Sequence, residues 1–395
     1  MTRTDLLRVL RWFVATSLAV SACDAGRPSV PSSGHGKWGW VVSLRGSNVT
    51  PGLDSAAGVL YVTTGQRELA ALDAHTGRLR WKRRYGDGAP FGENVALAGG
   101  VAAVGDVDVF AVDANDGTPL WQLSTPGNEG TRTIATDGST FFVAGGEGIV
   151  RRLDARSGRE LWSARLQRGD TTLAAFGPTL IDMLLFVCGN TFGTKVETGE
   201  LFALRAATGQ IVWRHQYSPE LPGQSSKCYS RVARSGDLIV EAQDDGRVFA
   251  HDAGSGAIRW TAPRVHSPPG DPSGPGTGPF DDRRYSAAGS GMLLATSDLG
   301  IIQALSPVDG HEIWRASQRG SPLDPPAVGS TSVAVNHGGV LVEYDLTRGA
   351  IIRRDPPSGS SASDSNRYYG APVVLHDTLF TSGSESIRAR RIGSR

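Results

Sequence analysis

The sequence has little of what a metal centre or a helical fold requires. Its 395 residues include three cysteines, three methionines and eight histidines. The cysteines form no CxxC pair and the histidines no His-x-x-x-His pair, so we predict no metal site. Few segments place apolar residues at i, i+3 and i+4, the spacing of an amphipathic helix. A predominantly helical fold is therefore not expected.

Long hydrophobic runs are also scarce. The apolar stretch Trp12–Val20 follows three arginines within the first eleven residues and is too short to span a bilayer as a helix. Small residues then lead to Cys23, and this pattern predicts a secretory signal peptide over residues 1–22. A Pro-, Gly- and Ser-containing linker over residues 23–35 is expected to follow.

The segment "AVSAC" resembles the cleavage site of a bacterial lipoprotein signal. The resemblance implies cleavage before Cys23, lipidation of that cysteine and attachment to a membrane facing the periplasm or the cell surface. The alternative is ordinary secretion with Cys23 unmodified. Whether the membrane is the inner or the outer one stays open.

An excess of charge of either sign is missing too. Without residues 1–22 the chain has 37 basic and 38 acidic residues, so its net charge is about −1. No global attraction to the phosphate backbone of nucleic acid follows, and we predict no nucleic-acid partner. The two cysteines other than Cys23 are Cys188 and Cys228, and they can form a disulfide in an exported protein or remain buried free thiols.

What the chain has in abundance is glycine, with 51 residues, and a repeated segment of the type "LAALDAHTGRLRW". The copies end at Trp81, Trp121, Trp162, Trp213, Trp260, Trp314 and Arg353. In every copy a glycine lies four residues before that final position, and the copies recur at intervals of 39 to 54 residues. A period close to 40 to 45 residues with about four strands per unit is typical of a β-propeller.

Each conserved-looking position in the repeat has a physical reason. The glycine suits a turn that needs positive φ, and the preceding aspartate of most copies can accept hydrogen bonds from turn amides. The tryptophan offers a large flat surface that can pack between neighbouring sheets while its N–H reaches a carbonyl. We therefore interpret the tryptophans as structural; an aromatic binding cage is the alternative.

The ends of the chain indicate how the ring closes. The last three strand-like segments, from residue 371 to the C-terminus, lack a fourth, and "GKWGW" has Gly36 four residues before Trp40. The N-terminal strand is thus predicted to complete the C-terminal blade, which also protects a sheet edge. The fold class predicted for residues 36–395 is an all-β, eight-bladed propeller of four-stranded antiparallel blades.

The "LDAxTGxxxW" pattern resembles the repeat of pyrroloquinoline-quinone-type propellers. Among these, a lipoprotein of this length with eight blades resembles the BamB-type component of the outer-membrane barrel assembly machine. The resemblance implies a non-catalytic scaffold that needs no cofactor and that holds envelope proteins, with the barrel assembly machine as the implied partner.

Three long connections between blades, at residues 214–229, 261–286 and 355–370, are rich in Pro, Gly and Ser and are expected on one face around the channel mouth. Basic and aromatic residues recur where such connections enter the next strand. The predicted partner-binding residues are Arg132, Tyr229, Arg231, Arg283, Arg284, Tyr285, Arg367, Tyr368 and Tyr369. Tyr and Arg are frequent in binding hot spots, although the same residues could instead pack the insertions.

Two other functions stay open. Quinoprotein dehydrogenases have a similar repeat, but they are longer and carry adjacent paired cysteines and a calcium beside the quinone. Here Cys188 and Cys228 are far apart in sequence, and Asp281-Asp282 are followed at once by Arg283-Arg284. We therefore predict no catalytic residue. A surface propeller that binds or senses polysaccharide is the third class, because tyrosines also stack on sugars.

Overall fold

The computed structural model describes residues 39–44, 51–86, 95–124, 133–219, 225–228, 231–263, 284–287, 291–297, 300–318, 325–355, 368–375, 377–383 and 386–392. The predicted signal peptide, the lipidation site Cys23 and the predicted linker lie outside the described residues. Within the described ranges, no helix has the length and apolar character needed to cross a membrane.

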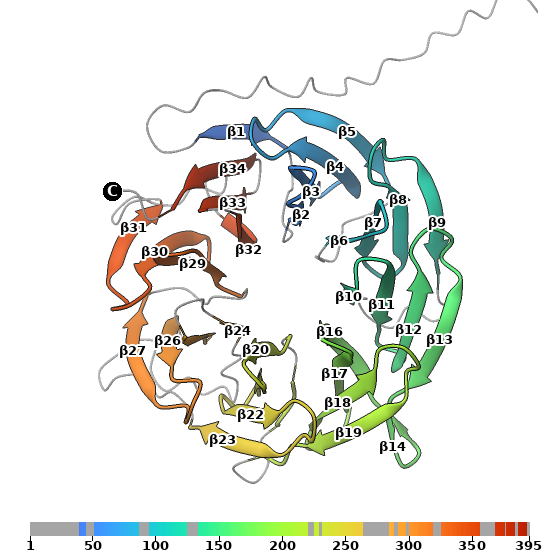
Figure 1. The fold of residues 1–395 in the computed structure, drawn as a ribbon, viewed down its shortest axis with the longest axis vertical. Coiled ribbons are helices and arrows are strands. Elements are labelled where there is room, and N and C mark those ends of the chain that lie inside the picture. Colours follow the sequence, from blue (N-terminus) through green and yellow to red (C-terminus); the bar gives the residue numbers. More distant parts are fainter. Residues whose placement is uncertain are drawn as a thin grey trace, which may run out of the picture.

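The described residues form eight four-stranded antiparallel sheets arranged as blades around a central axis (Figure 1). Blade 1 holds β2 (Gly52–Asp54), β3 (Val59–Thr63), β4 (Glu68–Asp73) and β5 (Leu79–Arg84). Blade 2 holds β6 (Val95–Ala98), β7 (Val101–Gly105), β8 (Val109–Asp113) and β9 (Pro119–Leu123). Blade 3 holds β10 (Thr133–Thr136), β11 (Thr140–Ala144), β12 (Ile149–Asp154) and β13 (Glu160–Arg165). Blade 4 holds β16 (Ala174–Ile181), β17 (Leu184–Asn190), β18 (Gly199–Arg205) and β19 (Ile211–Gln216).

The second half of the ring follows the same order. Blade 5 holds β20 (Ala233–Ser235), β21 (Leu238–Ala242), β22 (Val248–Asp252) and β23 (Ile258–Ala262). Blade 6 holds β24 (Arg284–Ala287), β25 (Leu293–Thr296), β26 (Ile301–Leu305) and β27 (Glu312–Ser317). Blade 7 holds β28 (Ala327–Val328), β29 (Ser332–His337), β30 (Val340–Asp345) and β31 (Ile351–Asp355). Blade 8 holds β32 (Tyr368–Leu375), β33 (Thr378–Gly383), β34 (Ser386–Arg391) and β1 (Trp40–Ser43).

Closure by the N-terminal strand is confirmed. Strand β1 pairs antiparallel with β34, with Trp40 opposite Ala389 and Ser43 opposite Ser386. The amide of Gly39 adds a bond of 2.7 Å to the Ala389 carbonyl. The outermost strand of blade 8 therefore comes from the opposite end of the chain, and Figure 1 shows β1 beside β34.

Contacts between tryptophan and glycine explain why the repeat carries these residues at fixed positions. The Trp40 indole N–H donates to the Ala74 carbonyl of blade 1 at 3.1 Å. A Cβ added at Gly77, whose φ is +72°, would lie 2.7 Å from the Trp40 ring. The same bond joins each following pair of blades through Trp81, Trp121, Trp162, Trp213, Trp260 and Trp314. The tryptophans thus act as links between neighbouring blades, as predicted.

The junction between blades 7 and 8 is built differently, because Arg353 stands in β31 where the other copies have tryptophan. Glu343 of β30 lies opposite Arg353 in the strand register and accepts a hydrogen bond of 2.7 Å from Arg390 of blade 8. The side chains of Glu343 and Arg390 are both buried. The Ser332 hydroxyl also donates to Glu343 at 2.9 Å. A buried, hydrogen-bonded ion pair therefore joins these two blades in the row where the tryptophan is missing.

One element was not predicted. Strands β14 (Gln167–Arg168) and β15 (Thr171–Thr172) form a short hairpin between blades 3 and 4. The interval of 51 residues between Trp162 and Trp213 was the available sign of an insertion. Arg168 fixes this hairpin to blade 4 by donating to Glu200 at 3.1 Å and to Thr198 at 2.8 Å.

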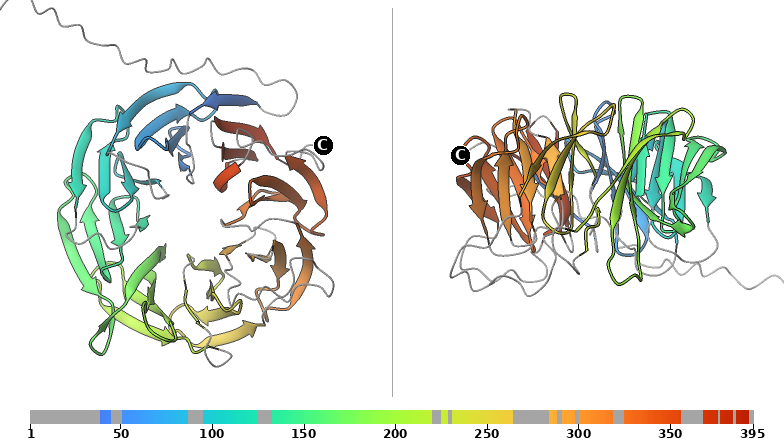
Figure 2. Two further views of the ribbon diagram at one scale, coloured as in Figure 1. Left: turned by 180° about the vertical axis from the view of Figure 1, so that it is seen from behind. Right: turned by 90° about the horizontal axis from the view of Figure 1, so that it is seen from below.

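Because neighbouring strands in a blade are antiparallel, the connections alternate between the two faces of the disc. Seen from the side, the strands run from one face to the other (Figure 2). One face carries the connections from each blade to the next and the connections between the second and third strands of each blade. We call it the loop face. The opposite face, which carries the turns such as that of Gly77, is called the hairpin face.

Candidate functional site

The structure places the predicted partner-binding residues at the loop face as far as it describes them. Arg284 and Tyr285 begin β24, and Tyr368 and Tyr369 begin β32. Both are first strands of their blades. These innermost strands surround the central axis of the ring (Figure 1), and each begins at the loop face. Outside the described residues lie Arg132, Tyr229, Arg283 and Arg367. A binding role for these residues stays a prediction.

Arg231 is the predicted residue whose side-chain contacts are described. It is exposed, and its guanidinium donates to the Ile134 carbonyl of β10 at 3.0 Å. Ile134 belongs to blade 3, whereas Arg231 immediately precedes blade 5. This arginine therefore helps to hold the connection in front of blade 5 against the inner strand of blade 3, which is the packing role considered as the alternative.

The segment 225–228, which leads from blade 4 toward Tyr229, is held firmly at the loop face. Cys228 forms a disulfide with Cys188 of β17, and their Cα atoms are 5.7 Å apart. The Asn190 side chain donates to the Cys228 carbonyl at 2.7 Å and accepts from the Cys228 amide at 3.1 Å. One buried amide side chain thus satisfies both backbone groups of this residue.

Backbone bonds join the same segment to both neighbouring blades. Toward blade 4, the Gly199 amide donates to the Ser226 carbonyl, and the Ser226 amide donates to the Glu197 carbonyl at 2.9 Å. Toward blade 5, the Lys227 amide donates to the Asp244 carboxylate at 2.6 Å, and the Asp244 amide donates to the Lys227 carbonyl at 2.8 Å. The segment therefore connects the two blades across the loop face.

The charged side chains around this segment are paired with one another. Lys227 is only 8% exposed and forms an ion pair with Glu197. The hydrogen bond from Lys227 lowers the pKa of Glu197. The Lys227 ammonium also lies 5.2 Å from the centre of the Phe192 ring. The buried carboxylate of Asp245 accepts from Arg247 at 2.6 Å. Pairing of this kind lowers the cost of burying the charges and holds the chain in position.

Glu241, at the end of β21, is the exception. Burial raises its pKa well above the ordinary value, the Asp245 and Asp244 carboxylates raise it further, and bonds from Gln243 and Tyr217 only partly oppose the shift. Gln243 donates to one of its oxygens at 2.6 Å. The shift favours the neutral, protonated form of this carboxylic acid.

Replacing Glu241 by glutamine tests this protonation state. The folded pKa is raised, so the folded chain binds more protons than the unfolded chain, and stability falls as pH rises above the unfolded value of about 4.3. We expect Glu241→Gln to match the wild type near pH 4 and to exceed its unfolding free energy at pH 7 by about 1 kcal/mol or more. Denaturant unfolding at both pH values measures this. The matched control is Glu160→Gln, which makes the same change at an exposed position. If the unfolding free energy of Glu241→Gln equals that of the wild type at both pH values, the pKa of Glu241 is not raised in the folded protein.

Two buried aromatic partners adjoin this acid. The Tyr217 hydroxyl and the His251 Nε2 are 3.0 Å apart. Burial raises the pKa of Tyr217 well above 10 and lowers the pKa of His251 to about 4. Both groups are therefore neutral at pH 7, and the pair is part of the core that supports the loop face.

The sequence interpretation missed this buried polar cluster. Its sign was "EAQDDG", residues 241–246, where charged residues interrupt an otherwise apolar strand. One oxygen of Glu241 and the sulfurs of Cys188 and Cys228 lie within 4.8 Å of one another. Metal ligation needs thiolates, and the sulfurs are joined in a disulfide, so this trio is not a metal site in the form described.

Comparison with known proteins identifies the family of the chain and relatives with different functions. The family model described as "Outer membrane protein assembly factor BamB" matches residues 29–172, 105–273 and 197–394 in overlapping parts. A serine/threonine-protein kinase, AfsK of Streptomyces griseus, is 30% identical over 333 residues, which are 80% of this chain and 36% of the kinase. The dehydrogenase subunit of a quinone alcohol dehydrogenase from Gluconacetobacter polyoxogenes is 24% identical over 88% of this chain and 46% of that protein.

The chain thus spans about a third of the kinase and less than half of the dehydrogenase. Among solved structures, BamB from Moraxella catarrhalis superposes with a TM-score of 0.65 at 15% identity, covering 89% of this chain and 97% of that one. At this identity the likeness shows the shared fold.

Proposed function

The chain belongs to the BamB family of pyrroloquinoline-quinone-like β-propellers, and on that premise we propose that it is a non-catalytic scaffold of the cell envelope. In this proposal the protein is exported, is anchored to a membrane by a lipid on Cys23, and binds partner proteins through its loop face. Assembly of outer-membrane proteins is the process we propose it serves, by analogy with the family description.

The construction of the loop face carries the proposal. The inner strands β24 and β32 begin at this face, with Arg284-Tyr285 and Tyr368-Tyr369. The disulfide and hydrogen bonds of segment 225–228 hold the connection between blades 4 and 5 in place. Loops on a rigid scaffold are the common site of recognition. A braced support reduces the conformational entropy that such loops lose when a partner binds.

Two observations favour a scaffold over a quinone-dependent dehydrogenase. Cys188 and Cys228 are 40 residues apart and link two segments of the ring, unlike the adjacent cysteines associated with those enzymes. The charged groups gathered near them are engaged with one another, as in the pairs Arg168–Glu200 and Arg247–Asp245. These arrangements account for the polar residues at this corner without a substrate.

An affinity pull-down from detergent-solubilised membranes tests the proposed class. We expect the full-length protein to recover envelope proteins, including components that assemble outer-membrane barrels. A designed eight-bladed propeller without the long connections is the control bait. Recovery of polysaccharide alone would support the sensor class instead, and quinone-dependent reduction of a dye by the purified protein would contradict the non-catalytic proposal.

A further inference from the structure

Three side chains that can bind a metal ion meet in the buried cluster between blades 4 and 5. Cys188 lies on β17 of blade 4, Glu241 lies on β21 of blade 5, and Cys228 lies in the connection between them. The two sulfurs and one carboxylate oxygen lie within 4.8 Å of one another. Ligand atoms of a tetrahedral zinc ion are roughly 3.3–3.8 Å apart, so small side-chain rotations suffice to surround an ion once the disulfide is open.

Glu241 has an oxygen that the fold leaves unsatisfied. Its Oε2 accepts from Gln243 at 2.6 Å, whereas the buried Oε1 has no hydrogen-bond partner within the part of the chain that the structure describes. A buried oxygen without a partner lowers stability, and a bound cation would remove that cost. The nearby Asp245 and Asp244 carboxylates make the surroundings of Glu241 more negative, which also favours a cation.

Bonds other than the disulfide hold these ligands in place. The Asn190 side chain is hydrogen-bonded to both backbone groups of Cys228, which also lies opposite Gln243 in an isolated antiparallel bridge. The Gln243 side chain accepts from the Ser226 hydroxyl at 3.1 Å and donates to Glu241. Groups that orient the ligands in this way are typical of metal sites. The two cysteines should therefore stay close together after reduction.

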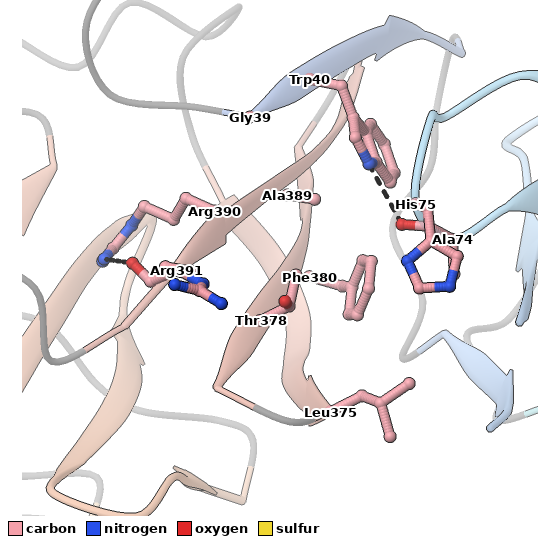
Figure 3. A pocket seen from close by; sticks show the side chains of 10 residues that line it. All are labelled: Gly39, Trp40, Ala74, His75, Leu375, Thr378, Phe380, Ala389, Arg390 and Arg391. Carbon is pink, nitrogen blue, oxygen red and sulfur yellow. Dashed lines mark hydrogen bonds between the residues drawn. The ribbon is translucent and has the colours of Figure 1, made fainter.

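The hollow of about 220 Å³ where the ring closes offers nothing comparable (Figure 3). Trp40 and Phe380, which border it, are core residues that are only 5% and 1% exposed. Its charged side chains are Arg390 and Arg391, and no carboxylate or thiol belongs to its described lining. That hollow does not favour a cation.

We propose that the reduced protein binds one Zn²⁺ ion through the thiolates of Cys188 and Cys228 and the carboxylate of Glu241. Thiolates and carboxylates are both zinc ligands, and thiolates select zinc over magnesium or calcium. The ion joins blade 4, blade 5 and the connection between them in place of the disulfide. This metal site does not depend on whether the loop face binds a partner.

The change of state is balanced in electrons and protons. A dithiol reductant gives two electrons and two protons to the disulfide, which becomes two thiols, and the reductant itself becomes a disulfide. Zinc then replaces both thiol protons, together with the proton of Glu241 where that group is protonated. Binding is therefore expected to weaken as the pH falls.

The test uses the full-length Cys23→Ser protein, in which Cys188 and Cys228 are the remaining cysteines. The protein is reduced with a phosphine and titrated with Cd²⁺, a substitute for zinc whose bonds to thiolates absorb in the ultraviolet. We expect one equivalent of Cd²⁺ to bind with this absorption, and Zn²⁺ to displace it. The oxidised protein should show no such absorption. Because the site is buried, Cd²⁺ is also added during refolding from urea.

Variants in the same background assign the binding to these residues. Glu241→Gln should weaken Cd²⁺ binding by at least about tenfold, since even the loss of a group that only orients a ligand costs 10–100-fold. The matched control Glu160→Gln, at an exposed position, should bind as the background does. Cys188→Ala/Cys228→Ala should show no thiolate absorption. The proposal would be overturned if the reduced protein shows no absorption by either route of loading, or if Glu241→Gln binds Cd²⁺ as tightly as the background.

Discussion

Deleting residues 36–44 is expected to lower the unfolding free energy by more than about 5 kcal/mol, because the loss of a buried tryptophan alone costs about 3–5 kcal/mol. The deletion removes β1, and with it the buried side chains of Trp40, Val42 and Leu44. It also breaks the ladder to β34 and the bond from Trp40 to blade 1. The melting transition should move down and broaden, because blades 8 and 1 are then no longer joined.

The matched control deletes residues 24–33, which lie in the predicted linker. This variant should melt with the wild type, as measured by calorimetry and far-UV circular dichroism. Equal melting temperatures for both deletions would show that β1 is not the latch that holds the ring closed.

Removal of the Cys188–Cys228 disulfide is expected to destabilise the protein by about 4 kcal/mol. The two cysteines are 40 residues apart, and the chain-entropy account gives about 3 kcal/mol for a loop of 15 residues and about 4.7 for one of 100. Both sulfur-bearing side chains are buried, so their replacement by alanine also leaves a small cavity. Urea unfolding of Cys188→Ala/Cys228→Ala measures the effect.

Reductant provides the internal control for this experiment. Dithiothreitol should shift the unfolding curve of the wild type and of Cys23→Ser toward that of the double variant, and it should not change the double variant. If the wild-type curve is unaffected by reductant under unfolding conditions, the disulfide does not contribute to stability.

The fold could be predicted because one local requirement is repeated in each blade. Gly77 must have positive φ and must leave room for the Trp40 ring, and both demands act on a residue at a fixed place in the repeat. The closing strand was predictable for the same reason, since Trp40 contacts blade 1 just as Trp81 contacts blade 2. A requirement for the same residue types at a regular interval can be recognised in a single sequence.

The site could be predicted only in part, because its contacts join residues that are distant in sequence and occur once. Arg231 and Ile134 are 97 residues apart, and Glu343 and Arg390 are 47 apart. Nothing in the repeat constrains such pairs. The raised pKa of Glu241 arises from burial and from the neighbouring Asp245 and Asp244 carboxylates, an arrangement that exists only in the folded chain.

The most direct test of the proposed function separates the two faces of the disc. The rim variant carries alanine at Arg284, Tyr285, Arg367 and Tyr369. The control variant carries alanine at three exposed positions of the hairpin face, Asn115, Arg156 and Arg348. We expect the rim side chains to be exposed as loop-face residues, so both variants should melt within a few degrees of the wild type, since exposed substitutions usually change stability by within about 0.5 kcal/mol each.

The decisive measurement is the amount of partner recovered by each protein from solubilised membranes. We expect the hairpin-face control to recover partners as the wild type does. The rim variant should lose most of its partner, because single Tyr and Arg anchors often contribute about 2 kcal/mol or more to binding. A folded rim variant that recovers every partner at the wild-type level would contradict binding through the loop face.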